Sequence, residues 1–306
     1  MKRKFKIWMM VVLCSVVAVT SGCGSSGNNG NGSDNNAAAD NGGSASSGNK
    51  GKTIDIALVD WAETIAVSNV WKQILENKGY TVKLHHTAKG PLYAGLSHGS
   101  VDVNLEVWLP HTDKPYVSKY KGELVKHKEW YEKTALGLTV PKYVKIDSIK
   151  QLNAHKNDFN GQIVGIEPGA SEMKLTEKVL KAYNLDYKLI QSSGPAMTAQ
   201  LKQAIDAKKP IVVTLWEPHW AFARWNLKFL KDPKNIYGDP DKIYWFSRTG
   251  FSKDYPKVTK WFDQWHMSHK QLSSLMNVIH KMDDPEKGAK KWLQSHQDLV
   301  KQWTAS

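Results

Sequence analysis

The sequence predicts an α/β fold with two lobes that begins at residue 53. From that point to the C-terminus, short apolar stretches of strand length alternate with amphipathic stretches of helix length. The alternation runs through two successive series, and a chain of 306 residues is long enough to form two buried cores. We therefore expect two sheets that are mostly parallel and flanked by helices.

The first series starts with TIDIALVD, an apolar run typical of a buried strand. In the helix that follows, Ile65, Val70, Ile74 and Leu75 form an apolar stripe at helical spacing, and Gly79 ends the helix. The strands predicted in this series are 53–60, 80–86, 101–108 and 135–140, and the helices are 63–78 and 91–98.

The second series contains strands at 162–166, 187–190 and 210–216 and helices at 171–183 and 195–207. A strand at 243–247 and helices near 253–264, 268–281 and 285–303 follow it. We assign residues 53–140 and 248–306 to lobe I and residues 141–247 to lobe II. The two chain crossings, near 140 and 247, would then form a hinge.

The N-terminus has the pattern of a secretory signal. Four basic residues lie within 2–6, and the apolar run 7–19 is too short for a typical transmembrane helix. Residues 20–22 are small and precede Cys23, an order that resembles a bacterial lipobox, although Thr20 replaces the usual aliphatic residue. The resemblance implies that the signal peptide is residues 1–22 and that Cys23 is lipidated. An ordinary secretory signal with an incidental cysteine is the alternative.

The segment after Cys23 predicts a flexible tether. Residues 24–51 contain no aliphatic side chain larger than alanine, so they cannot bury enough surface to offset the entropy of ordering. We expect residues 23–52 to form a lipidated linker that holds an extracytoplasmic protein at the cell membrane, most naturally in a Gram-positive cell. The only other cysteine is Cys14, which excludes a disulfide scaffold and a Cys-rich zinc site.

Several familiar patterns have little support. Ser97 lies in a G-x-S-x-G motif, but a helix precedes it and a strand follows it, the reverse of a nucleophile elbow. The histidine pairs 85–86 and 266/269 lack the acid or cysteine partners of a metal site. Without the four basic residues of the signal the net charge falls from +13 to +9, and the lysines are scattered along helices, which favours a solvated face near anionic lipid and wall polymer over a nucleic-acid site. We expect no catalytic residue, metal, cofactor or nucleic acid.

Tryptophan is unusually frequent, with 13 copies, more than a soluble domain needs for its core. Trp61, Trp108 and Trp216 each end a predicted strand, the place where open α/β sheets bind ligands. Core packing is the alternative for any one of them, but three in the same topological position predict a cage. An aromatic cage holds a quaternary ammonium, and each ring contributes about 0.5–2 kcal/mol when desolvated.

A second feature points to the other end of the same ligand. The stretch IVGIEPGAS at 163–171 predicts a strand, a tight turn and the start of a helix. Backbone N–H groups at such a turn suit a carboxylate. Together with the cage, this turn predicts a small zwitterion with a methylated ammonium and a carboxylate. We expect a cage without acceptors, so that a primary ammonium would lose its water without replacement hydrogen bonds.

At these residues the sequence resembles the glycine betaine-binding lipoproteins of osmoprotectant ABC importers, the OpuAC-like family. The resemblance covers about residues 53–304. The stretches that carry it are VDWAETIAVSNV, GPLYAGLSHGSVDVNLEVWLPHT, VGIEPGASEM, SSGPAMTAQLKQAIDAKKPIVVTLWEPHW and GFSKDYPKV. It implies a two-lobed periplasmic-binding-protein fold of type II, with the ligand cleft between the lobes.

The resemblance also implies roles for particular residues. The family's cage tryptophans correspond to Trp61, Trp108 and Trp216, and its carboxylate-binding amides to Gly165 and Ile166. Members close to this chain use a histidine five residues after the WLP tryptophan. Asp113 stands at that position here, and the nearby histidine is His111.

The function implied is that of a receptor and not of an enzyme. Glycine betaine, or a related betaine, would bind between the lobes of a monomer, which would deliver it to a membrane permease with a separate ATPase subunit. Two alternatives stay open from the residues: an exported serine hydrolase that uses Ser97, and a wall-binding module that holds glycans on exposed aromatic side chains.

Overall fold

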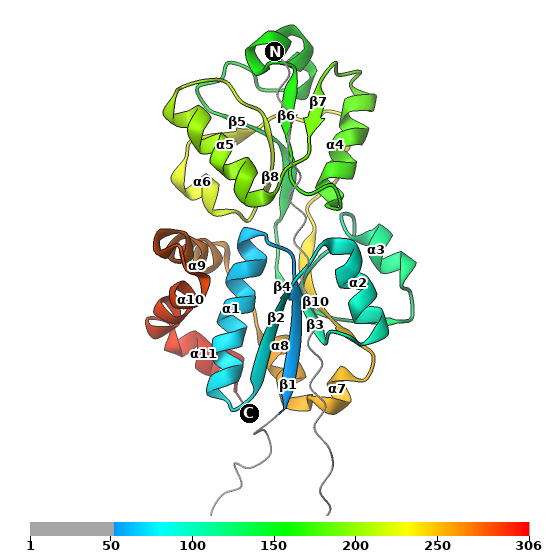
Figure 1. Ribbon diagram of the computed structural model, residues 1–306, viewed down its shortest axis with the longest axis vertical. Coiled ribbons are helices and arrows are strands. Elements are labelled where there is room, and N and C mark those ends of the chain that lie inside the picture. The colour runs from blue at the N-terminus through cyan, green and yellow to red at the C-terminus, as the bar shows by residue number, and fades with distance from the viewer. Residues whose placement is uncertain (1–51, 306) are drawn as a thin grey trace, which may run out of the picture. The chain divides into compact units, whose positions relative to one another are not determined.

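The computed structural model describes residues 52–305, which form two lobes, each built on a five-stranded sheet flanked by helices (Figure 1). The predicted signal peptide, the lipidation site Cys23 and the linker lie outside the described residues, apart from Lys52. Among residues 52–305, no helix is both long enough and apolar enough to cross a membrane.

The sheet of lobe I has the strand order β2-β1-β3-β10-β4. Its strands are β1 (Thr53–Leu58), β2 (Thr81–His86), β3 (Val103–Leu109), β4 (Leu124–Tyr131) and β10 (Lys242–Arg248). Strand β1 runs parallel to β2 and β3, whereas β10 runs antiparallel to β3 and β4. Every residue of β3 is buried, as expected for a central strand that is covered on both faces.

Eight helices of lobe I are α1 (Ala62–Asn77), α2 (Lys89–His98), α3 (Lys114–Lys119), α7 (Phe251–Asp254), α8 (Pro256–Gln264), α9 (His269–Met282), α10 (Pro285–Gln294) and α11 (Gln297–Trp303). Local sequence sets their ends. Ser268 and Gln271 form a capping box at the start of α9. Asp284 caps α10 through the amide of Lys287, and Pro285 occupies the first turn, where its missing N–H costs no hydrogen bond.

The sheet of lobe II has the order β7-β6-β8-β5-β9. Its strands are β5 (Ala135–Pro141), β6 (Gln162–Val164), β7 (Lys188–Ile190), β8 (Val213–Glu217) and β9 (Leu227–Phe229). The helices that accompany it are the 3-10 helix η1 (Ile149–Phe159) and the α-helices α4 (Ser171–Ala182), α5 (Gly194–Asp206) and α6 (Trp220–Arg224). Strand β6 is parallel to β7 and β8, and β5 is antiparallel to β8 and β9.

The α/β fold with two lobes is confirmed, but the chain crosses between the lobes at other points than predicted. The strand at 135–140, assigned to lobe I, pairs with β8 in lobe II, and the strand at 243–247, assigned to lobe II, pairs with β3 in lobe I. Because both of these strands enter antiparallel, each sheet is mixed and not mostly parallel. Sequence order alone places a strand beside its chain neighbours, whereas these two strands pair with distant ones.

The two crossings are joined to each other by hydrogen bonds. Thr134 Oγ1 donates to the carbonyl of Asp241 over 2.9 Å, and the amide of Asp241 donates to Thr134 Oγ1 over 2.8 Å. The Asp241 carboxylate accepts the amides of His111 and Thr112 at 2.7 and 2.8 Å. The hinge is therefore bonded directly to the loop that follows β3.

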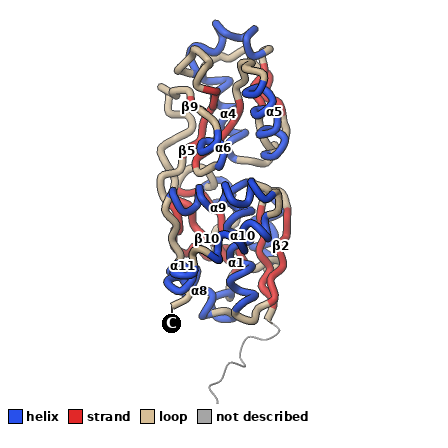
Figure 2. Tube along the Cα trace, turned by 90° about the vertical axis from the view of Figure 1, so that its left-hand side faces the viewer, coloured by secondary structure: helices blue, strands red, loops and turns tan. Residues whose placement is uncertain are grey.

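Helices of the two lobes also meet, beside the crossings. Figure 2 shows α6 of lobe II next to α9 of lobe I, and the rings of Trp220 and His280 stack there with centroids 3.8 Å apart. Six tryptophans are less than 2% exposed and belong to the core: Trp71, Trp130, Trp245, Trp265, Trp292 and Trp303. The expectation that the core does not need so many indoles was therefore wrong for lobe I.

The packing of α10 against α9 generates the first prediction. A Cβ atom at Gly288 would lie 2.6 Å from the Cα of Ile279, which is backbone and cannot move aside cheaply. We expect Gly288→Ala to lower the free energy of unfolding by about 1–3 kcal/mol, measured by urea denaturation. Gly90→Ala in α2 is the control, because a Cβ there meets nothing within 4 Å and alanine favours a helix. Equal stability of the two variants would contradict the close approach of the helices.

Candidate ligand-binding site

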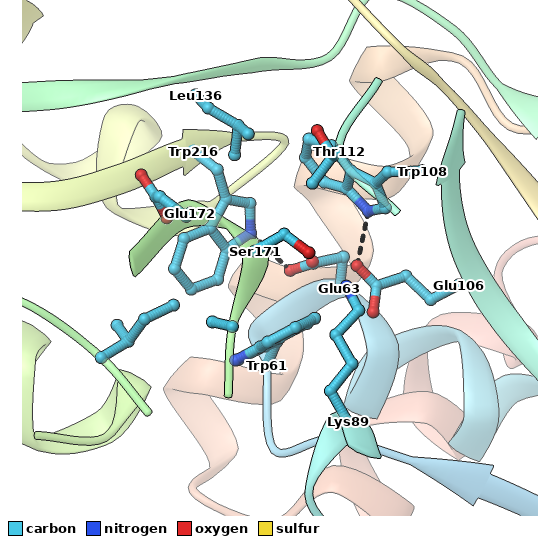
Figure 3. Close-up of a pocket in the computed structure, with 12 residues that line it drawn as sticks. Trp61, Glu63, Lys89, Glu106, Trp108, Thr112, Leu136, Ser171, Glu172 and Trp216 are labelled. Carbon is cyan, nitrogen blue, oxygen red and sulfur yellow. Dashed lines mark hydrogen bonds between the residues drawn. The ribbon is translucent and has the colours of Figure 1, made fainter. Parts of the chain in front are cut away.

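A small pocket lies between the two sheets, and each lobe contributes six of its lining residues. Those from lobe I are Trp61, Glu63, Lys89, Glu106, Trp108 and Thr112. Those from lobe II are Leu136, Ile166, Ala170, Ser171, Glu172 and Trp216. The three tryptophans predicted at strand ends are thus brought together around one space (Figure 3).

The ends of the strands position the three indoles. Trp61 follows β1 and is the N-cap residue of α1, Trp108 lies near the end of β3, and Trp216 lies near the end of β8. The rings of Trp61 and Trp216 come from different lobes and meet at 60°, with centroids 6.2 Å apart. The three indoles are at most 6% exposed. The rings therefore line a desolvated space, where their attraction for a cation is strongest.

Each of these indoles donates its N–H group to a glutamate. The bonds are Trp61 Nε1 to Glu167 Oε2 (2.9 Å), Trp108 Nε1 to Glu106 Oε1 (2.5 Å) and Trp216 Nε1 to Glu63 Oε2 (2.8 Å). Two of them join lobe I to lobe II, since Glu167 and Trp216 lie in lobe II. The carboxylates fix the plane of each ring, and the bonds across the cleft hold this closed arrangement.

The acids overturn the expectation of a cage without acceptors. Glu63 and Glu106 both line the pocket and are 0% and 3% exposed. Burial, and then the charge of Glu106, raise the pKa of Glu63 well above its ordinary value. Burial also raises the pKa of Glu106, although the Lys89 ammonium acts in the opposite direction. Two buried carboxyl groups so close together oppose each other's ionisation, so the pair is harder to ionise fully than two exposed acids.

The hydrogen bonds are consistent with a proton on Glu63. Its Oε1 atom is buried and accepts no hydrogen bond from the described residues, so it is free to carry the O–H. Glu106 accepts from Trp108 at one oxygen and from the hydroxyl of Thr64 at the other, over 2.7 Å. Both oxygens of Glu106 therefore have donors, whereas Glu63 has one oxygen without a partner among the described residues.

A buried ion pair forms another part of the wall. Lys89 Nζ lies 2.5 Å from Asp113 Oδ1, and the two side chains are 5% and 0% exposed. The same ammonium lies 4.7 Å from the ring centroid of Trp61. Asp113 stands five residues after Trp108, where the resemblance implies a histidine, and it accepts the Trp108 amide over 3.0 Å.

Of the three residues predicted to bind the ligand's carboxylate, only Ile166 lines the pocket. Ile166 lines the pocket, and its amide faces the sulfur of Met173 at 3.2 Å. The amide of Gly165 donates to the carbonyl of Ile190 over 2.9 Å and is not free for a ligand. A Cβ atom at Gly165 would lie 2.4 Å from the Met173 sulfur, so packing explains this glycine. His111 is exposed, and neither His111 nor Gly165 lines the pocket.

Sequence reasoning missed the polar wall of the pocket. Glu106 lies two residues before Trp108 on the same strand, so both side chains point to the same face of the sheet. A glutamate within a fully buried strand was the signal that could have revealed it. Lys89 gave no such signal, because only the fold brings α2 to the pocket.

The fold and the site define a two-lobed, type II substrate-binding protein with an aromatic pocket in its cleft. Residues 52–295 match the family described as the substrate binding domain of the ABC-type glycine betaine transport system, and the chain belongs to that family.

Individual relatives agree with this assignment. The glycine betaine/carnitine transport binding protein GbuC of Listeria monocytogenes is 39% identical over 173 residues, which are 56% of each chain, so the match spans about half of that relative's length. The lactococcal OpuAC, crystallised in its closed-liganded conformation with glycine betaine, is 34% identical with a TM-score of 0.78, covering 83% of this chain and 99% of that one. The glycine/betaine/L-proline-binding protein ProX of Borrelia burgdorferi is 32% identical with a TM-score of 0.79, covering 82% and 96%.

Glu172 in the pocket wall generates a prediction on stability. Burial raises the pKa of this carboxyl to about 8, against an ordinary value of 4.5. Between these values the unfolded chain releases the proton while the folded chain keeps it. The free energy of unfolding therefore falls as the pH rises from about 4.5 to about 8. Glu172→Gln should remove this part of the decline, measured by urea denaturation at pH 5 and pH 8. Glu177→Gln, an exposed change on the same helix, should keep the wild-type slope.

Proposed function

We infer that this chain is the substrate-binding protein of an ABC importer for glycine betaine and related quaternary ammonium osmoprotectants. The observation that carries this function is the set of three indoles, contributed by both lobes, around one buried pocket. The family assignment and the similar structure of the lactococcal OpuAC, crystallised with glycine betaine, support the same ligand class. Glycine betaine is the ligand that best matches both.

The cation end of the ligand is supported by two kinds of attraction. Each ring face offers about 0.5–2 kcal/mol to a desolvated cation, and Glu63 and Glu106 add carboxyl oxygens to the same pocket wall. A trimethylammonium has no N–H group, so it gains this attraction without needing hydrogen-bond acceptors. A primary ammonium would find an acceptor at Glu106, so preference for a quaternary over a primary ammonium must come mainly from the rings and the size of the pocket.

Binding would be coupled to closure of the cleft. The bonds from Trp216 to Glu63 and from Trp61 to Glu167 connect the lobes only when the cleft is closed. A ligand that touches tryptophans of both lobes binds this state better than an open one and shifts the population toward it. The closed form is then the species that a permease would recognise.

Anchoring and delivery complete the proposal. Lipidation at Cys23 would hold the protein on the extracytoplasmic face of the membrane, and residues 24–51 would allow it to reach the permease. A separate ATPase subunit would supply the energy for import. The receptor itself would act as a monomer without a cofactor.

The two other functions have less support. Ser97 Oγ donates to the carbonyl of Ala94 over 2.9 Å in the last turn of α2, as a helix-end serine does, and Ser97 does not line the pocket. A glycan-binding surface needs exposed aromatic rings. No described tryptophan is exposed, and Tyr143 is the one exposed residue among the described Trp, Tyr and Phe side chains, at 39%.

The tryptophan cage gives the direct test of ligand binding. We expect Trp108→Ala and Trp216→Ala each to weaken glycine betaine binding by about 2 kcal/mol or more, roughly 30-fold, because each change removes a ring face. Replacement by tyrosine should be milder because a face remains. Isothermal titration calorimetry measures the affinity.

Trp225→Ala is the matched control for the cage. Trp225 is half-buried and lines a neighbouring groove, but it does not line this pocket. Its variant should bind betaine as the wild type does. Wild-type affinity in both cage variants would rule out the cage.

The anchor has a test of its own. Cys23→Ser should abolish metabolic labelling by fatty acid and release the protein from the membrane fraction, because serine lacks the thiol that is acylated. Cys14→Ser, within the predicted signal peptide, is the control and should leave labelling intact. Labelling that persists in Cys23→Ser would show that the anchor is elsewhere or absent.

A further inference from the structure

The charged groups in the pocket wall are unevenly distributed. Glu63, Glu106 and Glu172 are acids, and Lys89 is the one cationic side chain among the twelve residues that line the pocket. A zwitterionic ligand places its carboxylate a few bonds from its ammonium. If the rings hold the ammonium, the carboxylate needs a positive or donating group within the same small space, and Lys89 is the charged candidate.

The Lys89 ammonium has unused capacity to donate hydrogen bonds. An ammonium carries three N–H donors, and the polar partner found for Lys89 among the described residues is Asp113, at 2.5 Å. Asp113 uses one of these donors, and the ring centroid of Trp61 lies 4.7 Å from Nζ. With its side chain only 5% exposed, water satisfies the remaining donors poorly. An acceptor that enters the pocket would satisfy them, and this capacity favours a carboxylate over an alcohol.

Asp113 is satisfied without Lys89. Its carboxylate also accepts the Trp108 amide over 3.0 Å, the Tyr93 hydroxyl over 3.2 Å and the Ser171 hydroxyl over 3.1 Å. These three donors spread its negative charge and hold it in place. Asp113 therefore positions the ammonium at the pocket wall and leaves it able to contact a second anion.

The backbone alternative is weaker in this chain. The Gly165 amide already donates to Ile190, and the Ile166 amide faces the weakly accepting sulfur of Met173. Glu172 lies next to Met173 in the first turn of α4, and burial raises its pKa to about 8. It is therefore mostly neutral at pH 7 and does not repel an anion.

We propose that Lys89 is the counter-ion of the ligand's carboxylate and the residue that makes the pocket prefer betaines over quaternary ammonium compounds without a carboxylate. This assignment rests on the proposed function. It goes beyond that function because it names one side chain on α2, held by Asp113, as the determinant of selectivity for a ligand with a carboxylate.

The test compares two ligands that differ at one end. Glycine betaine and choline share the trimethylammonium, but choline has a hydroxyl in place of the carboxylate. Isothermal titration calorimetry of both ligands would be performed on the wild type, Lys89→Met and Lys89→Gln. The Gln variant retains a donor to Asp113 without the charge, which protects the fold, and circular dichroism with thermal melting confirms that each variant is folded.

We expect both variants to lose about 10- to 100-fold in betaine affinity, the range typical of a hydrogen bond to a charged group. Choline affinity should stay within about 3-fold of the wild type or rise, since choline does not use the charge and a competing cation has left the Trp61 face.

Lys174→Met is the matched control. Lys174 Nζ also lies 4.7 Å from an aromatic ring, that of Tyr116, but it is exposed and does not line the pocket. Its variant should bind both ligands as the wild type does. An unchanged betaine affinity in folded Lys89 variants, or an equal loss for both ligands, would overturn the assignment. A wild type that binds neither ligand would instead overturn the proposed function.

Discussion

The hydrogen bonds between tryptophans and glutamates are the interactions on which the rest of the site depends. An indole that packs loosely against other rings can rotate, whereas one whose N–H group is held by a buried carboxylate has a fixed plane. Two of the three bonds, Trp216 to Glu63 and Trp61 to Glu167, also join the lobes. The same contacts therefore set the shape of the pocket and the closed state of the cleft.

The glutamates also determine the charge of the pocket. Burial and mutual repulsion raise the pKa values of Glu63 and Glu106, so full ionisation of this pair in the pocket wall is unfavourable. Lys89 and Asp113 supply a second, internally compensated pair beside them. The wall therefore brings a pair of carboxyl groups and a lysine ammonium into one small space.

The hinge and the pocket are part of one hydrogen-bonded structure. Thr134 and Asp241 join the two chain crossings, and the Asp241 carboxylate holds the amides of His111 and Thr112 in the loop after β3. Thr112 lines the pocket, and Asp113 follows it. Rotation of the lobes about the crossings would therefore displace the loop that carries Asp113, the partner of Lys89.

The sequence by itself determined the α/β class, the two lobes and the strand ends where Trp61, Trp108 and Trp216 meet, because hydrophobic periodicity and strand-end position are local properties. Only the tertiary structure decided which lobe receives β5 and β10, because those strands pair with distant partners. It also placed six other tryptophans in the core and His111 outside the pocket. The Gly165 amide donates to the carbonyl of Ile190 in β7. Glu63 and Lys89 reach the ligand space through long-range packing that their neighbours in the chain do not reveal. Glu106 shares a strand face with Trp108, and only its pairing with Glu63 required the fold.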